Sequence, residues 1–495
     1  MTSTIAVRAP AAESWEGVRR LPSFHRSDSG AAQWYDGRST GFRFLVTSKN
    51  LFLDDADRGR FRVTHLARPG STGVTWLSCR AVDEQTVSLS NPREPARQLT
   101  IRDGDLHGDL PGDETYTFML EAWSNDTEVR NRMLLEGLIA QGRISVSPSG
   151  IPTYTGIRWH DGLADRVDGM LLGLAIGDAL GNTSEGLDPA RRRELHGEIR
   201  DYLPNSSAQG RPVGVPTDDT QLSFWTVESL LEEGRLDPDA LARKFGASRV
   251  HGIGQTMERF LAANGAGVPW PEAAPRSAGN GALMRIAPVI LPHLLTSGET
   301  FHADAIICAA LTHNDPASIS SCLAFARMLV DLAGMDGPPE PGWWPVAFIR
   351  YARPVEGEET SYSLRQGPHA GRFTGPLWRF VEERLVGDAQ RYPDLPSGVA
   401  DWSSGSYLLE TVPSVLLTLM RHADDPEEAI IRAVNDTRDN DTIASIVGAA
   451  VGALHGGDAL PARWKDGLSG RVRSSDDGSV PRLIKAAVDR WVNSA

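Results

Sequence analysis

The spacing of apolar residues changes along the chain near residue 155. Before that point, short apolar stretches at 61–66, 74–77 and 116–120 are separated by turns rich in Gly, Pro and Asp, which predicts β-strands, and one helix is expected over 127–141. After it, apolar residues recur at helical spacing and strand signals are sparse. The pattern predicts a small α+β N-terminal domain followed by an all-α domain.

The second part contains a series of segments in which apolar residues repeat with the period of a helix. These segments are 165–180, 303–334, 407–422, 426–435, 441–455 and 481–493, together with a helix that follows Thr217. Residues 335–400 are rich in Pro and Gly, and we expect them to form a long excursion over the surface.

The passage Ser145–Pro152 consists largely of Ser, Pro and Gly and offers little that could pack in a core. Because this composition is typical of a linker, we predict one domain over residues 1–155 and another over residues 156–495. Nothing in the first of these domains points to chemistry.

The formal net charge of −14 is unevenly placed along the 495 residues. Basic and acidic side chains are equal in number within residues 1–158, so the whole excess falls on residues 159–495. An acidic body argues against binding of nucleic acid through its backbone charge. An anionic substrate would need metal ions or helix N-termini to be accepted here.

Cysteine content and terminal sequence indicate the compartment. Cys79, Cys308 and Cys322 are too few for a disulfide framework and lack metal-ligand spacing. The first residues lack the apolar core of a signal peptide, and the longest mostly apolar run, 443–454, is too short to span a bilayer. We therefore expect a cytoplasmic protein without a membrane partner.

Two acidic clusters far apart in the sequence are the strongest chemical signal. They are Thr217-Asp218-Asp219-Thr220 and Asp439-Asn440-Asp441-Thr442, and neither contains His or Cys. Carboxylate and hydroxyl oxygens suit Mg²⁺ or Mn²⁺ rather than Zn²⁺. If the fold brings the clusters together, four carboxylates and two threonines could hold a pair of metal ions, which would favour water chemistry on an anionic substrate.

Helix capping is the other interpretation of both clusters, because each one opens an apolar helix and because Thr and Asp are common at helix starts. Capping explains the first cluster well. It explains the second less well, since Asp436, Asp439 and Asp441 are costly to bury unless a cation neutralises them. Gly448 and Gly452, four residues apart on the second helix, would let another helix approach closely.

Two glycine-containing segments are open to two interpretations each. Gly177-Asp178-Ala179-Leu180-Gly181, followed by Glu185, fits tight helix packing as well as a nucleotide loop, because no strand precedes it. Gly279-Asn280-Gly281 runs small residues into a helix, which suits either a phosphate contact or a plain turn. His313, beside a helix, is more often structural than catalytic.

Taken together and in order, these features resemble the ADP-ribosylglycohydrolase family, which includes the ADP-ribosylarginine hydrolases, over about residues 160–460. The family's Gly-Asp-Ala-x-Gly with a following Glu looks like Gly177–Gly181 with Glu185, and its Thr-Asp-Asp-Thr is Thr217–Thr220. Its remaining motifs resemble Gly279–Arg285, Thr312–His313, Asp439–Ala444 and, with Ser in place of the first Gly, Ser406–Thr411.

The resemblance implies an all-α ADP-ribosylglycohydrolase-like fold with a binuclear magnesium centre, in which Mn²⁺ could replace Mg²⁺. By resemblance, one ion would be held by Thr217, Asp218, Asp219 and Asp441, and the other by Asp439, Asp441 and Thr442. Two departures stand out, since relatives often have Gly-Gly at Thr437-Arg438 and Asp-Thr-Asp-Thr at Asp439–Thr442. Both leave the ligand positions intact, but Arg438 would put a bulky cation beside the mouth of the site.

The implied reaction is hydrolysis of the bond between the anomeric ribose carbon of ADP-ribose and an acceptor side chain. Asp218, Asp219 or Glu185 would take the proton. The amides of Gly279, Asn280 and Gly281 would cradle the pyrophosphate. Asp178, His313 and Tyr407 would make the remaining substrate contacts.

The acceptor and the role of the first domain stay open. An ADP-ribosylated protein modified on arginine is the substrate that the resemblance favours, with serine, nucleic-acid base and small-molecule linkages as alternatives. Residues 1–155 would dock the modified protein, bind a cognate ADP-ribosyltransferase so that the chain acts as an immunity protein, or only stabilise the fold. A non-catalytic relative and a magnesium-dependent phosphohydrolase are rival functions, and intact ligand positions count against the first.

Overall fold

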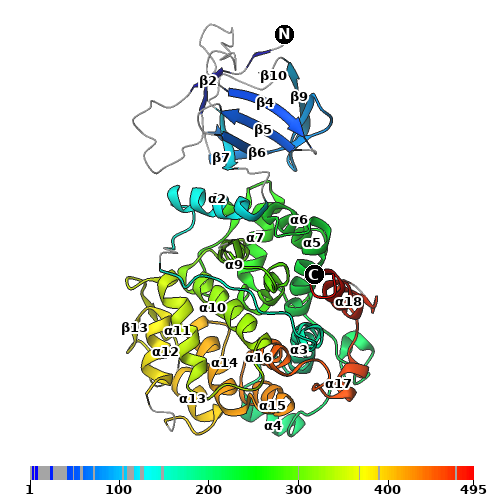
Figure 1. Cartoon of the computed structure of the whole chain (residues 1–495), viewed down its shortest axis with the longest axis vertical. Coiled ribbons are helices and arrows are strands. Elements are labelled where there is room, and N and C mark those ends of the chain that lie inside the picture. Colours follow the sequence, from blue (N-terminus) through cyan, green and yellow to red (C-terminus); the bar gives the residue numbers. More distant parts are fainter. Residues whose placement is uncertain are drawn as a thin grey trace. The chain divides into compact units, whose positions relative to one another are not determined.

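The structure is a computed structural model, and it describes residues 3–4, 6–8, 23–25, 42–47, 50–55, 59–70, 73–102, 105–108, 116–122, 127–146, 150–298, 300–366, 368, 370–387, 391–473 and 476–494. The chain divides into two compact units (Figure 1). The first comprises Met1–Ile144 and Arg259–Ala273, and the second comprises Ser145–Glu258 and Ala274–Ala495.

The first unit is built on an antiparallel sheet with the strand order β1-β10-β9-β8-β7-β6-β11-β3-β2, in which β6 also pairs with β5, and β5 with β4. The strands are β1 Ser3–Thr4, β2 Ala6–Arg8, β3 Ser23–His25, β4 Phe42–Thr47, β5 Asn50–Asp55, β6 Gly59–Gly70, β7 Gly73–Ala81, β8 Thr86–Asn91, β9 Glu94–Arg102, β10 Asp105–Gly108 and β11 Tyr116–Ala122. The three predicted strands lie within β6, β7 and β11, so the α+β prediction for the N-terminal region is confirmed.

The core of this sheet is formed by alternate apolar residues of its central strands, such as Leu77, Val87 and Leu99, which are 2% exposed or less. One helix, α2 (Thr127–Ala140), follows the sheet close to its predicted bounds. The unit also takes in the end of α7 (Gln255–Gly265) and α8 (Trp270–Ala273). Asn91 of β8 donates a hydrogen bond of 3.4 Å to the carbonyl oxygen of Ala266 in that insertion.

The second unit is almost entirely helical (Figure 1). Its helices are α3 Leu163–Asn182, α4 Pro189–His196, α5 Asp218–Glu233, α6 Pro238–Gly246, α9 Thr300–Ala310, α10 Pro316–Ala333, α11 Trp343–Glu356, α12 Leu377–Leu385, α13 Leu395–Trp402, α14 Leu408–His422, α15 Pro426–Asp436, α16 Asn440–His455, α17 Ala462–Gly467 and α18 Ser479–Trp491. A two-stranded hairpin, β12 (Tyr362–Ser363) and β13 (Thr374–Gly375), lies between α11 and α12.

The central feature of this unit is the close contact between α3 and α16 (Figure 1). A Cβ atom added to Gly173 would lie 2.2 Å from the carbonyl oxygen of Gly448, and one added to Gly177 would lie 2.1 Å from that of Ala444. The two backbones therefore touch, which only glycine permits at these positions. Of the two interpretations of the Gly177 segment, helix packing is confirmed.

Two predicted elements differ from the structure. The segment 303–334 is two helices, α9 and α10, because Pro316 begins a new helix that Asp315 caps through the Ala317 amide. The predicted surface excursion over 335–400 is wrong. The segment 335–400 contains α11, α12 and most of α13. Trp344, Trp378 and Trp402 of these helices are 2% exposed or less.

Pro and Gly in the stretch between α10 and α14 mark the turns between short packed helices, which is why composition alone suggested a loop. Among the helices that the structure describes, α10 has the length and hydropathy to cross a membrane, and 94% of that window is buried inside the protein.

Candidate metal centre

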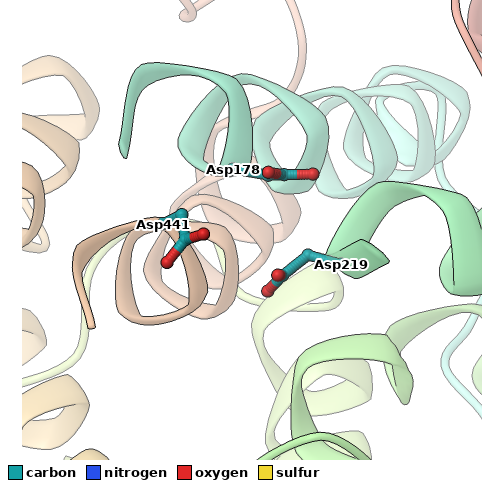
Figure 2. Close-up of side chains that lie close together, drawn as sticks. All are labelled: Asp178, Asp219 and Asp441. Carbon is teal, nitrogen blue, oxygen red and sulfur yellow. The ribbon is translucent and has the colours of Figure 1, made fainter. Parts of the chain in front are cut away.

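Three carboxylates from three different helices meet in the second unit (Figure 2). Asp178 comes from α3, Asp219 from the first turn of α5 and Asp441 from the first turn of α16. One carboxylate oxygen of each lies within 4.8 Å of the other two. Glu185, Asp439 and Asp441 form a second group of the same kind. The predicted convergence of the two acidic clusters is confirmed.

Asp178 fixes the start of α5. Its carboxylate accepts hydrogen bonds from the N–H and hydroxyl of Thr217, at 2.9 and 2.7 Å, and from the N–H and hydroxyl of Thr220. Thr217 is the N-cap residue, yet its side chain makes no capping bond, so an acid from another helix does the capping. This engagement gives Asp178 a positioning role, and its predicted substrate contact stays a prediction.

The two predicted clusters touch through Thr442, whose hydroxyl lies 3.4 Å from Oδ2 of Asp219. The N–H of Thr442 donates to Oδ1 of Asp441 at 2.9 Å. Thr442, Asp219 and Asp441 are all at most 6% exposed. The N-termini of α5 and α16 thus bring side-chain oxygens together at buried positions.

The donor set fits a divalent cation. Oδ1 of Asp219 is buried and has no hydrogen-bond partner among the described residues, which is costly for a carboxylate unless a cation approaches it. Burial raises the pKa of Asp218, Asp219 and Asp441 well above the usual range, and repulsion from neighbouring carboxylates raises it further. A bound Mg²⁺ or Mn²⁺ would satisfy the orphan oxygen and cancel this repulsion.

Asp439 lies at the N-cap of α16 and is held by Asn280, whose amide nitrogen donates to Oδ2 at 2.6 Å. The pKa of Asp439 is raised to about 7. Burial is the main cause, Glu185 and Glu410 add to the rise, and the hydrogen bond from Asn280 opposes it. Glu185 is exposed at the edge of the group, and its own pKa is raised by partial burial and by Asp178. Glu185 therefore has access both to solvent and to the cluster.

The Gly279-Asn280-Gly281 loop is held by hydrogen bonds within the protein, and its role as a pyrophosphate cradle stays a prediction. The Asn280 N–H donates to the carbonyl oxygen of Ser406 at 3.0 Å, and that of Gly279 donates to the Ser277 hydroxyl at 3.3 Å. Two of the three amides are therefore engaged within the protein. The loop's clearest contribution is the side chain of Asn280, which orients Asp439.

His313 packs against this loop, since a Cβ atom on Gly281 would lie 2.9 Å from its ring. Arg285 donates to the Thr312 hydroxyl oxygen at 2.7 Å, and that hydroxyl lies 3.0 Å from Nδ1 of His313. The arrangement directs the hydroxyl hydrogen to Nδ1, which leaves the imidazole proton on Nε2. Burial, then Arg285, lowers the pKa of His313 to about 3, so the ring is neutral.

Tyr407 is the N-cap residue of α14 and pairs through its backbone with Gly279. Its ring is 8% exposed. Tyr407 therefore lies behind the same loop as Asn280 and His313. The structure brings these predicted substrate-side residues together next to the acidic groups.

Arg192 is the main residue that the sequence did not reveal. It is fully buried, and its guanidinium donates to the hydroxyl and carbonyl of Ser184 and to the carbonyl oxygens of Leu187 and Thr437. It therefore ties the loop that carries Glu185 to the segment before Asp439. Arg192 is the middle residue of the run Arg191-Arg192-Arg193, and no local sequence signal separates it from its neighbours.

Comparisons with known proteins agree with the geometry. A family model described as ADP-ribosylglycohydrolase matches residues 159–493. The ADP-ribosyl-[dinitrogen reductase] glycohydrolase of Rhodospirillum rubrum is 27% identical over 330 residues, which is 65% of this chain and 97% of that protein. The ADP-ribosylarginine hydrolase Tri1 of Serratia proteamaculans is 27% identical over 63% of this chain and 77% of its own length.

A solved structure described as an ADP-ribosylglycohydrolase-related protein complex superimposes with a TM-score of 0.50 at 25% identity. The match covers 68% of this chain and 100% of that chain. The family model begins at residue 159, so residues before it have no counterpart in it.

Proposed function

This chain belongs to the ADP-ribosylglycohydrolase family, and we propose that it hydrolyses the bond between ADP-ribose and an arginine side chain of a modified protein. The observation that carries the proposal is the meeting of Asp178, Asp219 and Asp441 around a buried Asp219 oxygen that has no hydrogen-bond partner in the described part of the chain. The name of the Serratia relative favours arginine as the acceptor. Another ADP-ribosyl linkage is the alternative.

The residues that would hold metal are Thr217, Asp218, Asp219, Asp439, Asp441 and Thr442, and the ions we favour are two Mg²⁺. The chemistry that such ions supply is activation of water and neutralisation of the clustered carboxylates. Two acidic groups overlap at Asp441, and this overlap favours a pair of ions that share Asp441 over a single ion.

The protein's own residues would order the remaining chemistry. Asp178 and Arg192 hold the two helix starts and the Glu185 loop in place. Glu185 is exposed beside the cluster, and its pKa is raised, so it is suited to exchange a proton with water or with the leaving side chain. Asp218, which is 8% exposed, is the other candidate for proton transfer. When the acceptor side chain leaves the ribose, positive charge develops on the sugar in an oxocarbenium-like transition state. The surrounding carboxylates are suited to stabilise that charge.

We propose that the first unit recognises the modified protein or a partner ADP-ribosyltransferase, as an immunity protein would. Cross-linking of the full chain to an ADP-ribosylated protein or to such a transferase, followed by mass spectrometry, tests this role. Cross-links concentrated in residues 1–144 support it. Cross-links confined to residues 145–258 and 274–495 would contradict it.

The reaction is tested with ADP-ribosylated arginine, serine and DNA-base substrates in Mg²⁺, with products identified by mass spectrometry. We expect release of intact ADP-ribose from arginine, and its loss in excess EDTA and in Asp441→Asn. Release of inorganic phosphate instead would identify a phosphohydrolase. Turnover that continues in EDTA would rule out the metal-dependent assignment.

A further inference from the structure

The hairpin between α11 and α12 is anchored next to the candidate site. The hydroxyl of Tyr362 on β12 donates to Oδ1 of Asp315 at 2.7 Å and accepts from the Ala317 N–H at 3.1 Å. Leu364 is 3% exposed, and Phe373 before β13 packs against Phe380 with 4.9 Å between ring centroids. The residue that follows Leu364 is therefore held at a defined position.

That residue, Arg365, lies over the ring of Tyr407, with 4.0 Å between its guanidinium carbon and the ring centroid. The side chain is exposed and makes no ion pair with any residue that the structure describes. A guanidinium held by its face on an aromatic ring keeps its N–H edge free for a planar or tetrahedral anion. Stacking thus fixes Arg365 without occupying its donors.

Arg365 is connected to the acidic groups through short contacts. Tyr407 pairs with Gly279, and Asn280, the next residue, donates to Asp439. Glu410, one helical turn from Tyr407, is 2% exposed; burial raises its pKa, and Arg365 and Arg438 partly offset the rise. An exposed cation therefore lies at the border of a strongly acidic site.

The acidic charge of the site means that a cation at its border would favour binding of an anionic ligand. Carboxylates repel a diphosphate, and the N–H groups of Gly279 and Asn280 donate hydrogen bonds within the protein. Arginine binds phosphate oxygens through paired N–H donors, a geometry that lysine lacks. The position and the free edge of Arg365 match this need.

We propose that Arg365 is a specificity-determining residue that binds the diphosphate of the ADP-ribosyl group while Tyr407 holds its guanidinium face. The inference rests on the proposed function and assigns the diphosphate contact to the hairpin rather than to the glycine loop. Arg365 acts on binding, not on the bond that breaks. Its loss therefore changes KM rather than kcat.

The test compares Arg365→Ala and Arg365→Lys with the wild-type chain in Mg²⁺. Arg391→Ala is a matched control, because Arg391 is likewise exposed and lies 5.3 Å from the ring of Tyr392. Calorimetry gives Kd for ADP-ribose, ADP and adenosine, and turnover gives KM and kcat. We expect R365A to weaken ADP-ribose and ADP binding at least roughly tenfold, R365K to weaken both less, and R391A to change neither.

Adenosine separates the diphosphate from the rest of the ligand. Its affinity should stay within about twofold of the wild-type value in R365A, as should kcat, because neither depends on the phosphates. An unchanged KM in R365A, an equal loss of adenosine binding, or an equal loss in R391A would overturn the inference. A wild-type chain that binds ADP-ribose through Arg365 without hydrolysing any linkage would overturn the proposed reaction alone. A chain that does neither would overturn both.

Discussion

The hydroxyl of Thr442 lies 3.4 Å from a carboxylate oxygen of Asp219, although the two residues are 223 positions apart in the sequence. This contact places the first turns of α5 and α16 against each other. The carboxylates of both turns lie near the N-termini of α5 and α16. The positive ends of the two helix dipoles therefore offset part of the negative charge there. What remains is an excess of buried carboxylate that a divalent cation would balance.

Asp219→Asn removes the carboxylate whose Oδ1 has no partner among the described residues. We expect the wild-type chain to gain roughly 3 kcal/mol of stability at an Mg²⁺ concentration about one hundred times Kd, and D219N to gain little. Without metal, D219N should melt no lower than the wild type, because one repelling charge is gone. Thermal melts with and without Mg²⁺ measure both effects.

Asp239→Asn is the control for that comparison, since Asp239 also lies in the first turn of a helix, α6, away from the acidic groups. It should keep the full response to Mg²⁺. An unaltered Mg²⁺ response in D219N would show that Asp219 holds no ion.

Gly448→Ala should disrupt the contact between α3 and α16. The added Cβ would lie 2.1 Å from the carbonyl oxygen of Gly173, so the helices must separate. We expect a loss of roughly 3 kcal/mol or more in the free energy of unfolding, together with loss of activity, because Asp441 lies on the displaced helix. Chemical denaturation measures the first effect.

Gly246→Ala is the matched control, because an added Cβ at Gly246 in α6 meets nothing within 4 Å. That variant should be as stable as the wild type or slightly more stable. A G448A protein as stable as G246A would mean that the two helices can repack around a methyl group.

Arg192→Lys should affect the site through position. A lysine cannot donate simultaneously to Ser184, Leu187 and Thr437, so buried carbonyl groups lose partners at about 1–3 kcal/mol each. At an assay temperature well below the melting temperature of the variant, we expect kcat to fall at least roughly tenfold while KM changes little. Steady-state kinetics beside denaturation curves separate this effect from simple unfolding.

Arg191→Lys provides the comparison, since Arg191 is exposed and pairs only with Glu194 among the described residues. Its kinetics and stability should equal those of the wild type. If R192K also retains the wild-type kcat, Arg192 supports the fold but does not position the site.

Glu356 gives the second unit a pH-dependent stability outside the candidate site. At the end of α11, it caps α12 by accepting the N–H groups of Leu377 at 2.6 Å and Trp378 at 3.1 Å, and burial raises its pKa to about 7. The folded pKa lies above the unfolded one, so this contribution falls as pH rises from about 4.5 to about 7. Glu356→Gln removes the ionisation.

The free energy of unfolding of E356Q relative to the wild type should therefore rise by about 2.5 kcal/mol between pH 5 and pH 8. Urea denaturation at several pH values measures it. A difference that stays constant with pH would show that Glu356 ionises normally in the folded protein.

The acidic clusters and the glycines could be found from the sequence because their signals are local. Oxygen ligands at a helix start indicate a possible metal site, and glycines every four residues indicate close helix packing. Both patterns can be recognised without knowing where the helices lie in the fold. The order of the motifs then indicated the family. Helix bounds such as those of α16 followed from the same apolar periodicity.

The roles of Asp178 and Arg192 could not be predicted, because they depend on partners brought together by the fold. Asp178 looked like one acid in an apolar helix, and its function as a cap requires α5 to cross it. The excursion over 335–400 was mispredicted because Pro and Gly outweighed Trp344 and Trp378, whose size alone indicated a packed segment. The hairpin that carries Arg365 was missed for the same reason.

The backbone contact between α3 and α16 has an evolutionary consequence. The backbones of α3 and α16 touch directly, with no side chain between them. Substitution of a side chain therefore cannot fine-tune the distance between the two helices at this joint. The distance between Asp178 and Asp441 is thus unaffected by sequence changes in the surrounding core. Segments outside this joint, such as the hairpin between α11 and α12, can change in sequence without moving the carboxylates.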